Sequence, residues 1–378
     1  MLSPCNNSPW DVIIIGAGPS GIGVAHILQE LKVKRFLILE KHEVGASFQR
    51  WPQEMRFITP SFNSTPFGQL DLNAVVLNTS PANFLHTEHP SGPQYSSYLR
   101  KLAEELALPI KTGIDIQGLE YCAKKKRFTV SSRTESFQTR FVVWAAGEFQ
   151  YPNLTPFPGA EWCLHNSQVK SWRELPGSDH LIIGAFESGM DAAIHLSTAG
   201  KRVKLLNSDP GLRVAVQDPS SSLSPFTRER VTAVARESGR LSIEHNVWVT
   251  QVERRENMYR VLADSGKSWE SEQPPILAIG FSGSLQLVRS SFSWNEKGHP
   301  ELSDQDESVK TPGLFLVGPQ VRHEPHIFCY IYKFRQRFAI VAEAIASQLR
   351  LDTSLLESYI KQNMYLDDLT CCGSDCQC

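Results

Sequence analysis

The sequence predicts an α/β fold with two Rossmann-like dinucleotide-binding domains and small β-meanders. Two segments carry this prediction: DVIIIGAGPSGIGVAHILQEL at residues 11–31 and HLIIGAFESGMDAAIHLSTAGKRVKLLN at residues 180–207. In each, an apolar run leads through a glycine turn into a helical pattern and is followed by another apolar strand, which is typical of a βαβ unit. A β-rich stretch comes after each unit, so the same fold is expected twice.

The remaining elements follow in order along the chain. RFLILE (35–40) completes the first unit, residues 57–93 predict surface loops because they are rich in Pro, Asn, Ser and Thr, and residues 95–106 predict an amphipathic helix. Residues 110–141 predict a small meander. After the second unit, strands are expected at 241–255, 259–264, 274–281 and 313–318, and one long helix at 329–349.

These elements divide into a discontinuous domain and an inserted one. We predict an FAD-binding domain at 1–155 and 285–350, an NAD(P)H-binding domain at 156–284, and a C-terminal helix with a Cys-rich tail at 351–378.

Composition excludes several classes of protein. The 378 residues are 41% hydrophobic and 21% charged, and the net charge of −2 gives no electrostatic reason for binding nucleic acid or an anionic membrane. The apolar run DVIII is too short for a signal peptide or a membrane span. We therefore expect a cytoplasmic protein with reduced thiols; the oligomeric state is not predicted.

The first glycine turn predicts a dinucleotide site. Gly16 permits the tight turn, Gly18 lets the backbone approach a diphosphate, and Gly21 lets helix and strand pack closely. Glu40 ends the next strand, where its carboxylate can accept hydrogen bonds from a ribose.

Further motifs resemble those of flavin-containing monooxygenases, including plant auxin-type enzymes and bacterial flavoproteins associated with cation transport. VGASFQRWP (44–52) resembles a G-G-x-W segment, and MRFITPSF (55–62) resembles R-L-x-T-P. VVWAAGEFQYPNLTPFPG (142–159) with HNSQVKSW (165–172) resembles a first hinge, and ILAIGF (276–281) a second. GLFLVGPQ (313–320) and QRFAIVA (336–342) resemble the closing strand and helix. Disulfide reductases of the glutathione type carry a redox cysteine pair after the second strand, and this chain has none there.

The resemblance implies FAD on the first turn and NADP on the second, with NAD as the alternative. The implied FAD contacts are Gly16, Gly18, Pro19, Ser20, Gly21, Glu40, Lys41, Ser47, Phe48, Trp51, Ile116, Ala146, Gly318 and Pro319. The implied NAD(P) contacts are Gly184, Phe186, Glu187, Ser188, Gly189, Asn207, Ser208 and Gly280.

The second turn departs from the pattern at Phe186, which occupies the position of the middle glycine. A Cβ there denies the backbone its closest approach to a diphosphate, so the site either works with altered affinity, is degenerate, or is remodelled. No acidic residue ends the strand VKLLN, and Lys201, Arg202 and Lys204 offer positive charge to a 2′-phosphate or form a solvated strand edge. These observations favour NADP.

The implied reaction oxygenates a soft nucleophile or small organic substrate with O2 through a flavin peroxide, and Asn63, Thr59 and Tyr330 are candidate polar groups of the site. The first alternative is a disulfide, quinone or metal-ion reductase, because Cys329 begins the predicted final helix, whose dipole lowers a thiol pKa. A second alternative is a non-catalytic flavoprotein.

The C-terminal cysteines and one histidine loop raise the question of a metal. Cys371, Cys372, Cys376 and Cys378 can offer thiolates to a soft ion, serve as a redox relay, or belong to a disordered reduced tail. VRHEPH (321–326) holds two imidazoles and a carboxylate, but without a third ligand we expect an ordinary loop.

Overall fold

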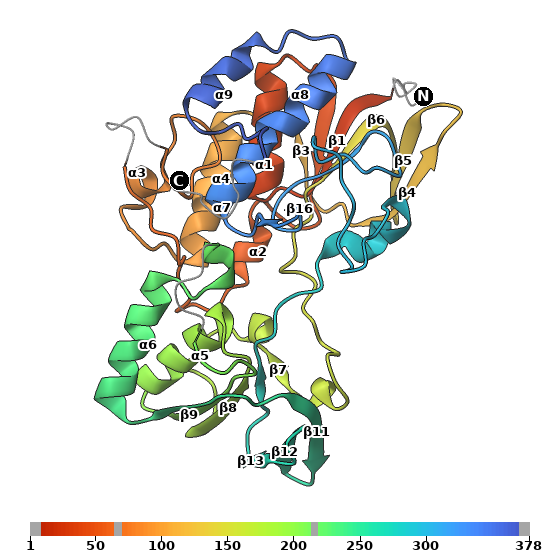
Figure 1. The fold of residues 1–378 in the computed structure, drawn as a ribbon. Coiled ribbons are helices and arrows are strands. Elements are labelled where there is room, and N and C mark those ends of the chain that lie inside the picture. The colour runs from red at the N-terminus through yellow and green to blue at the C-terminus, as the bar shows by residue number, and fades with distance from the viewer. Residues whose placement is uncertain (1–8, 64–69, 213–217, 370–378) are drawn as a thin grey trace, which may run out of the picture.

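The computed structural model describes residues 9–63, 70–212 and 218–369, and it has two lobes (Figure 1). The first lobe contains a 7-stranded sheet in the order β3-β2-β1-β6-β5-β4, with β15 paired to β6. Its strands are β1 (Trp10–Ile15), β2 (Phe36–Leu39), β3 (Ile110–Lys111), β4 (Ile116–Cys122), β5 (Arg127–Ser132), β6 (Ser136–Trp144) and β15 (Leu314–Leu316).

This first sheet combines a parallel part with a meander. β2, β1, β6 and β15 run parallel, whereas β4, β5 and β6 are antiparallel neighbours. The lobe's helices are α1 (Pro19–Glu30), α2 (Ala46–Gln49), α3 (Pro81–Leu85), α4 (Gly92–Glu105), α7 (Ile331–Phe334), α8 (Phe338–Gln348) and α9 (Glu357–Lys361). Residues of β1, α1 and α8 form the centre of one large buried core.

The second lobe repeats the βαβ arrangement with a sheet in the order β10-β9-β8-β14-β7, all parallel. These strands are β7 (Leu164–His165), β8 (Asp179–Ile183), β9 (Arg202–Leu206), β10 (Leu241–Glu244) and β14 (Ile276–Leu277), with helices α5 (Glu187–Thr198) and α6 (Pro225–Ser238). A separate antiparallel meander contains β11 (Val249–Arg255), β12 (Met258–Ala263) and β13 (Ser268–Ser271).

The predicted fold class is therefore confirmed: two Rossmann-like units, the second inserted into the first, each accompanied by a meander. The exact domain boundaries at residues 155 and 284 stay a prediction. None of the helices in the described ranges combines the length and the apolar character needed to cross a bilayer.

The single long helix predicted at 329–349 is wrong. The helical structure starts at Ile331, and a 3-10 turn at Arg335–Arg337 separates α7 from α8. Both arginines of this turn are buried: Arg337 pairs with Asp306, and the Arg335 guanidinium donates to the carbonyls of Asp71 and Ala74. Burying two cations on one turn is the feature that distinguishes this segment from a regular amphipathic helix.

Glu54 joins the two lobes. This first-lobe carboxylate accepts hydrogen bonds from the Ser171 hydroxyl at 2.6 Å and the Trp172 amide at 3.0 Å, and Trp172 lies in the core of the second lobe. Burial acts to raise the pKa of Glu54, but these hydrogen bonds outweigh it, so that the pKa is lowered. The contact therefore depends on the ionised form.

We expect Glu54→Ala to lower the free energy of unfolding by about 1.5–3 kcal/mol, because hydrogen bonds to charged groups contribute roughly this much. Because the folded-state pKa is depressed, the stabilisation is present above the ordinary carboxyl pKa and is lost as pH falls through the folded value. Thermal melts over pH would check this. In Glu54→Gln, whose side chain does not titrate, the loss of stability at acid pH that Glu54 causes should be absent. If the stability of Glu54→Gln depends on pH as the parent's does, Glu54 is not the group responsible.

Candidate active site

The first glycine turn has the geometry of a diphosphate cradle. Gly16 has φ +106°, and a Cβ there would lie 2.6 Å from the Ala145 carbonyl oxygen; a Cβ on Gly21 would lie 1.9 Å from the Gly16 carbonyl oxygen. A Cβ on Gly18, by contrast, would meet no protein atom within 4 Å. Gly16 and Gly21 are thus required by packing, whereas Gly18 leaves open space at the amide end of α1, where anions bind.

The second turn has the same backbone with one side chain added. Gly184 has φ +103°, and a Cβ on Gly189 would lie 1.9 Å from the Gly184 carbonyl oxygen, as in the first turn. Phe186 precedes α5 with φ −99° and ψ −163°, close to the −85° and −171° of Gly18 before α1. Phe186 is therefore the structural equivalent of Gly18, and its ring is 38% exposed.

Both turns open into one cavity of about 430 Å3. Most of its wall is aromatic or aliphatic, including Met55, Ile58, Phe149, Phe281 and Phe334. It also brings together many of the predicted residues: Gly16, Gly18, Pro19, Ser20, Glu40, Ser47, Phe48, Trp51, Thr59, Ala146, Phe186, Glu187, Ser188, Pro319, Cys329 and Tyr330.

Other predicted contacts lie outside this wall. In the first lobe, Lys41 pairs with Asp115 at 3.2 Å, Ile116 is buried at the start of β4, and Gly318 packs against Ser20. In the second lobe, Asn207 donates to the Gly211 carbonyl and faces His245, Ser208 is exposed, and the carbonyl of Gly280 is 3.1 Å from His165 Nε2. Their roles toward the cofactors stay predictions.

Glu40 lies at the edge of the first cradle and is only 6% exposed. Its carboxylate accepts hydrogen bonds from the amides of Ala17 and His42, both at 2.8 Å. These bonds fix the carboxylate beside the turn, and its remaining lone pairs are available to ribose hydroxyls.

Asn63 does not lie in the cavity wall; it is exposed. Within the same loop-rich stretch, Asn73 is buried and lines the cavity instead, and Asn166 is a second buried asparagine of the wall. The side-chain amide nitrogen of Asn73 donates to the Thr59 carbonyl and the Ser61 hydroxyl, both at 2.9 Å, and its backbone carbonyl accepts from the Tyr95 hydroxyl. The signal that sequence reasoning missed is an asparagine placed directly before the apolar run Ala74–Leu77, where burial is expected.

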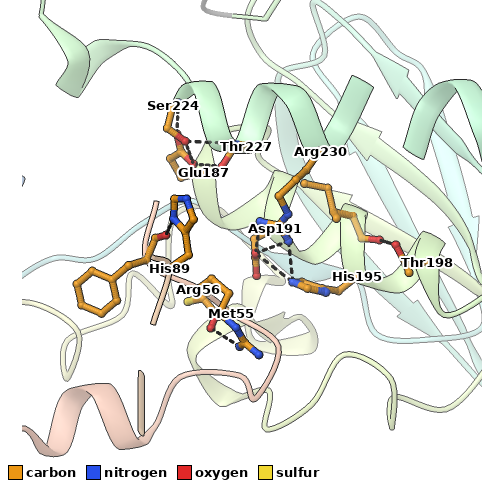
Figure 2. Close-up of polar contacts among 12 residues, drawn as sticks. Met55, Arg56, His89, Glu187, Asp191, His195, Thr198, Ser224, Thr227 and Arg230 are labelled. Atoms are coloured by element: carbon orange, nitrogen blue, oxygen red, sulfur yellow. Dashed lines mark hydrogen bonds and ion pairs between the residues drawn. The ribbon is translucent and has the colours of Figure 1, made fainter. Parts of the chain in front are cut away.

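Asp191 of α5 presents a buried oxygen without a partner. Its Oδ1 lies 3.3 Å from His195 and 3.4 Å from Arg230 (Figure 2). Its Oδ2 is buried and has no hydrogen bond in the described structure, although the residue lines the cavity. A buried acceptor without a donor costs about 1–3 kcal/mol. The second cradle therefore fits a ligand that carries an N–H donor, such as the carboxamide of a nicotinamide.

Glu187, also predicted to contact NAD(P), uses its side chain for another purpose. Its carboxylate accepts hydrogen bonds from the Ser224 amide and the Thr227 hydroxyl, both at 2.5 Å (Figure 2). Burial raises the pKa of Glu187, and these hydrogen bonds oppose the change. Glu187 thus connects the N-termini of α5 and α6.

Lys201, Arg202 and Lys204, for which a 2′-phosphate site and a solvated strand edge were the two predictions, make contacts away from the cradle. Lys201 donates to the carbonyls of Leu175 and Gly177, Arg202 pairs with Asp179, and Lys204 pairs with Glu244. Arg202 begins β9 and faces Asp179, the first residue of β8. The parallel strands end at the cradle, so this pair marks the opposite edge of the sheet.

Cys329 lines the cavity, but the prediction of an activated thiol is wrong. The helix begins two residues later, with Tyr330 as its N-cap, so the thiol does not occupy the first turn. Burial raises the pKa of the Cys329 thiol, against the opposing effects of Ser220, Lys333 and Arg322. Cys329 is exposed and lines the cavity.

The four cysteines predicted to bind a metal, Cys371, Cys372, Cys376 and Cys378, lie outside the described residues. In the VRHEPH loop, His323 pairs with Asp306, and His326 lies 2.7 Å from the Leu369 carbonyl. Across residues 9–63, 70–212 and 218–369, no group of three His, Cys, Asp or Glu side chains could hold a metal ion.

Comparisons with known proteins agree with this geometry. The model of the pyridine nucleotide-disulphide oxidoreductase family matches residues 13–318. Among curated relatives, the uncharacterized oxidoreductase CzcO of Bacillus velezensis is 32% identical over 194 residues, which are 50% of this chain and 52% of CzcO. The match thus spans about half the length of that relative.

Two solved structures share the fold across 90% of this chain. The bacillithiol disulfide reductase Bdr of Staphylococcus aureus has a TM-score of 0.73 at 21% identity, covering 99% of Bdr. The ornithine N-hydroxylase of Kutzneria sp. 744, solved with reduced FAD, NADP+ and ornithine, also has a TM-score of 0.73, at 13% identity and covering 100% of that chain.

These matches confirm the predicted resemblance to flavin-dependent monooxygenases and the predicted cofactors, FAD and NADP. They include both an oxygenase and a disulfide reductase, so they do not choose between these reactions. The chain belongs to the pyridine nucleotide-disulphide oxidoreductase family.

Proposed function

We propose that the chain is an NADPH-dependent flavin monooxygenase that oxygenates a soft nucleophile, at sulfur or nitrogen, in a small apolar molecule. The observation that carries this proposal is the composition of the cavity wall. Most of the wall is aromatic or aliphatic, and in the described part of the chain it contains one thiol, Cys329, rather than a pair. An apolar wall excludes water, and oxygen chemistry at a flavin requires that water be excluded.

In this proposal the protein's residues position and shield the reactants. The amide end of α1 and Gly18 would hold the diphosphate of FAD, and Glu40 would hold its ribose. The turn before α5 would hold NADP, and Asp191 Oδ2 would be available to an N–H donor such as the nicotinamide carboxamide. When bound, FAD supplies the electron transfer from NADPH and the activation of O2. Asn73 and Thr59 are the polar groups that we propose to orient the substrate.

Reduction of a small disulfide is the second candidate. It is supported by the bacillithiol disulfide reductase fold and by Cys329 in the cavity wall. Its difficulty is that a raised thiol pKa makes Cys329 a poor nucleophile, because the thiolate is the attacking form.

Purified holoprotein supplied with NADPH and isotopically labelled O2 tests the first candidate against the second. A panel of thioethers and tertiary amines should yield products that carry the labelled oxygen. Turnover of a disulfide without oxygen, and no labelled product from any member of the panel, would reject the oxygenase proposal in favour of the reductase.

Cys329→Ser gives an independent prediction. If the oxygenase proposal holds, labelled product should form at a rate within about twofold of the parent, because no thiol chemistry is needed. Cys122→Ser, which changes an exposed cysteine on β4, is the matched control. A loss of about 100-fold or more in Cys329→Ser alone would instead assign the thiol a catalytic role.

A further inference from the structure

Glu148 is a carboxyl group of the cavity wall for which the site described above has no use. It follows Gly147, which has φ +66°, in the segment that leaves β6 and crosses to the second lobe. Backbone hydrogen bonds from Ser284 to the Gly147 carbonyl and from Tyr151 to the Glu148 carbonyl hold this segment in place. The side chain of Glu148 lines the same cavity as Cys329 and Tyr330.

The carboxyl of Glu148 has no hydrogen bond or ion pair within the described residues, unlike the other acids of the wall. Glu40 accepts two amides, Glu187 is bound to Ser224 and Thr227, and Asp191 Oδ1 faces Arg230 and His195. An uncommitted carboxyl in an apolar wall can take up and release a proton without breaking a structural contact.

Burial and a neighbouring positive charge act in opposite directions on the proton of Glu148. Burial raises the pKa of Glu148, and the nearby guanidinium of Arg322 acts in the opposite direction. Arg322 belongs to β16 (Arg322–His323) and donates to the Pro319 and Val321 carbonyls, so it is held near Glu148. Arg322 also interacts electrostatically with Cys329 and Asp218.

Either candidate reaction consumes one proton per turnover. Oxygenation of a substrate S follows NADPH + H+ + O2 + S → NADP+ + SO + H2O, and disulfide reduction follows NADPH + H+ + RSSR → NADP+ + 2 RSH. NADPH supplies the two electrons as hydride, so a proton must reach the reacting oxygen or sulfur from elsewhere. An apolar cavity needs an internal group to carry that proton.

We propose that Glu148 is this group: its carboxyl O–H donates the proton to the oxygen atom that leaves as water, or to the sulfur that leaves as a thiol, and the carboxylate regains a proton from solvent after each turnover. The inference rests on the proposed function only in requiring an NADPH-driven reaction in this cavity, and it applies to either candidate. It makes Glu148 a catalytic residue with the role of general acid.

Infrared spectroscopy of the holoprotein gives a readout that does not depend on activity. The pKa of Glu187 is also raised, so Glu187→Gln identifies the contribution of that carboxyl to the spectrum. A separate carbonyl-stretch band of a protonated carboxylic acid should persist above the ordinary carboxyl pKa, disappear on further alkalinisation, and be absent from Glu148→Gln. Glu120→Gln, which changes an exposed glutamate on β4, should retain the band. Absence of the band from the parent protein, or its survival in Glu148→Gln, would overturn the proposal.

Single-turnover kinetics of the FAD-loaded protein test the proton donation itself. The rate of the step after flavin reduction should be about 100-fold lower in Glu148→Gln, which is within the range for loss of a general acid. In the parent this rate should decrease at alkaline pH, and in Glu148→Gln that decrease should be absent. Glu148→Asp should recover part of the rate and the pH dependence. Equal rates and pH profiles in parent and Glu148→Gln would overturn the proposal.

The rate of flavin reduction by NADPH distinguishes failure of the proposed function from failure of the proposed role of Glu148. Flavin reduction is a hydride transfer, and its rate should be similar in the parent and in Glu148→Gln. If NADPH fails to reduce the flavin in the parent, the proposed function fails; if reduction is normal and only the next step lacks the predicted dependence, the role of Glu148 fails.

Discussion

Gly18→Phe is expected to give a folded protein that binds almost no FAD. The fold should tolerate the change, because a Cβ on Gly18 meets no protein atom within 4 Å and Phe186 already occupies the equivalent backbone position before α5. The new side chain fills the space at the amide end of α1. The Kd for FAD should rise at least about 100-fold, or about 2.7 kcal/mol, measured as flavin absorbance per chain and by titration of apoprotein.

Gly211→Phe is the matched control for that substitution. A Cβ on Gly211 also meets no atom within 4 Å, and the residue lies outside the cavity wall. Gly211→Phe should therefore remain yellow. If Gly18→Phe also keeps a full complement of FAD, the diphosphate does not lie against the turn at residues 16–21.

Phe186→Gly is expected to tighten NADP+ binding by about tenfold, the equivalent of 1.4 kcal/mol. The substitution restores the glycine that lets a backbone amide approach a diphosphate, and glycine is well accepted immediately before a helix. The packing glycines Gly184 and Gly189 are unaffected. Titration of the oxidised holoprotein with NADP+ measures the Kd directly.

Phe281→Ala is the comparison for Phe186→Gly, since it also removes an aromatic ring from the cavity wall but lies outside the cradle. It should not tighten binding. Weaker NADP+ binding in Phe186→Gly would mean that the Phe186 ring stacks on the nucleotide rather than obstructing it.

The sequence predicted most of the fold because its strongest signals are local. The glycine turns, the apolar strands and the alternation at residues 110–141 each specify backbone geometry within a few residues. The equivalence of Phe186 and Gly18 could be predicted from spacing alone, and the matching dihedral angles bear it out.

The errors concern features that depend on distant residues. Asn63 and Asn73 lie in the same loop-rich stretch, and only contacts with Thr59, Ser61 and Tyr95 decide which asparagine is buried. The 3-10 turn between α7 and α8 depends on Asp306 and on carbonyls of residues 71 and 74. For Arg202 and Lys204 the sequence already favoured the strand edge over a 2′-phosphate site, since both precede the carboxyl end of their strand, where ligands bind.

Anaerobic mixing of the yellow holoprotein with NADPH tests most directly whether both nucleotides meet in the one cavity. We predict that the visible absorbance of the bound flavin bleaches in a single turnover while one NADPH is oxidised per flavin. If the flavin stays oxidised although NADPH is bound or present in excess, the two nucleotides do not share one cavity, and the proposed function is contradicted.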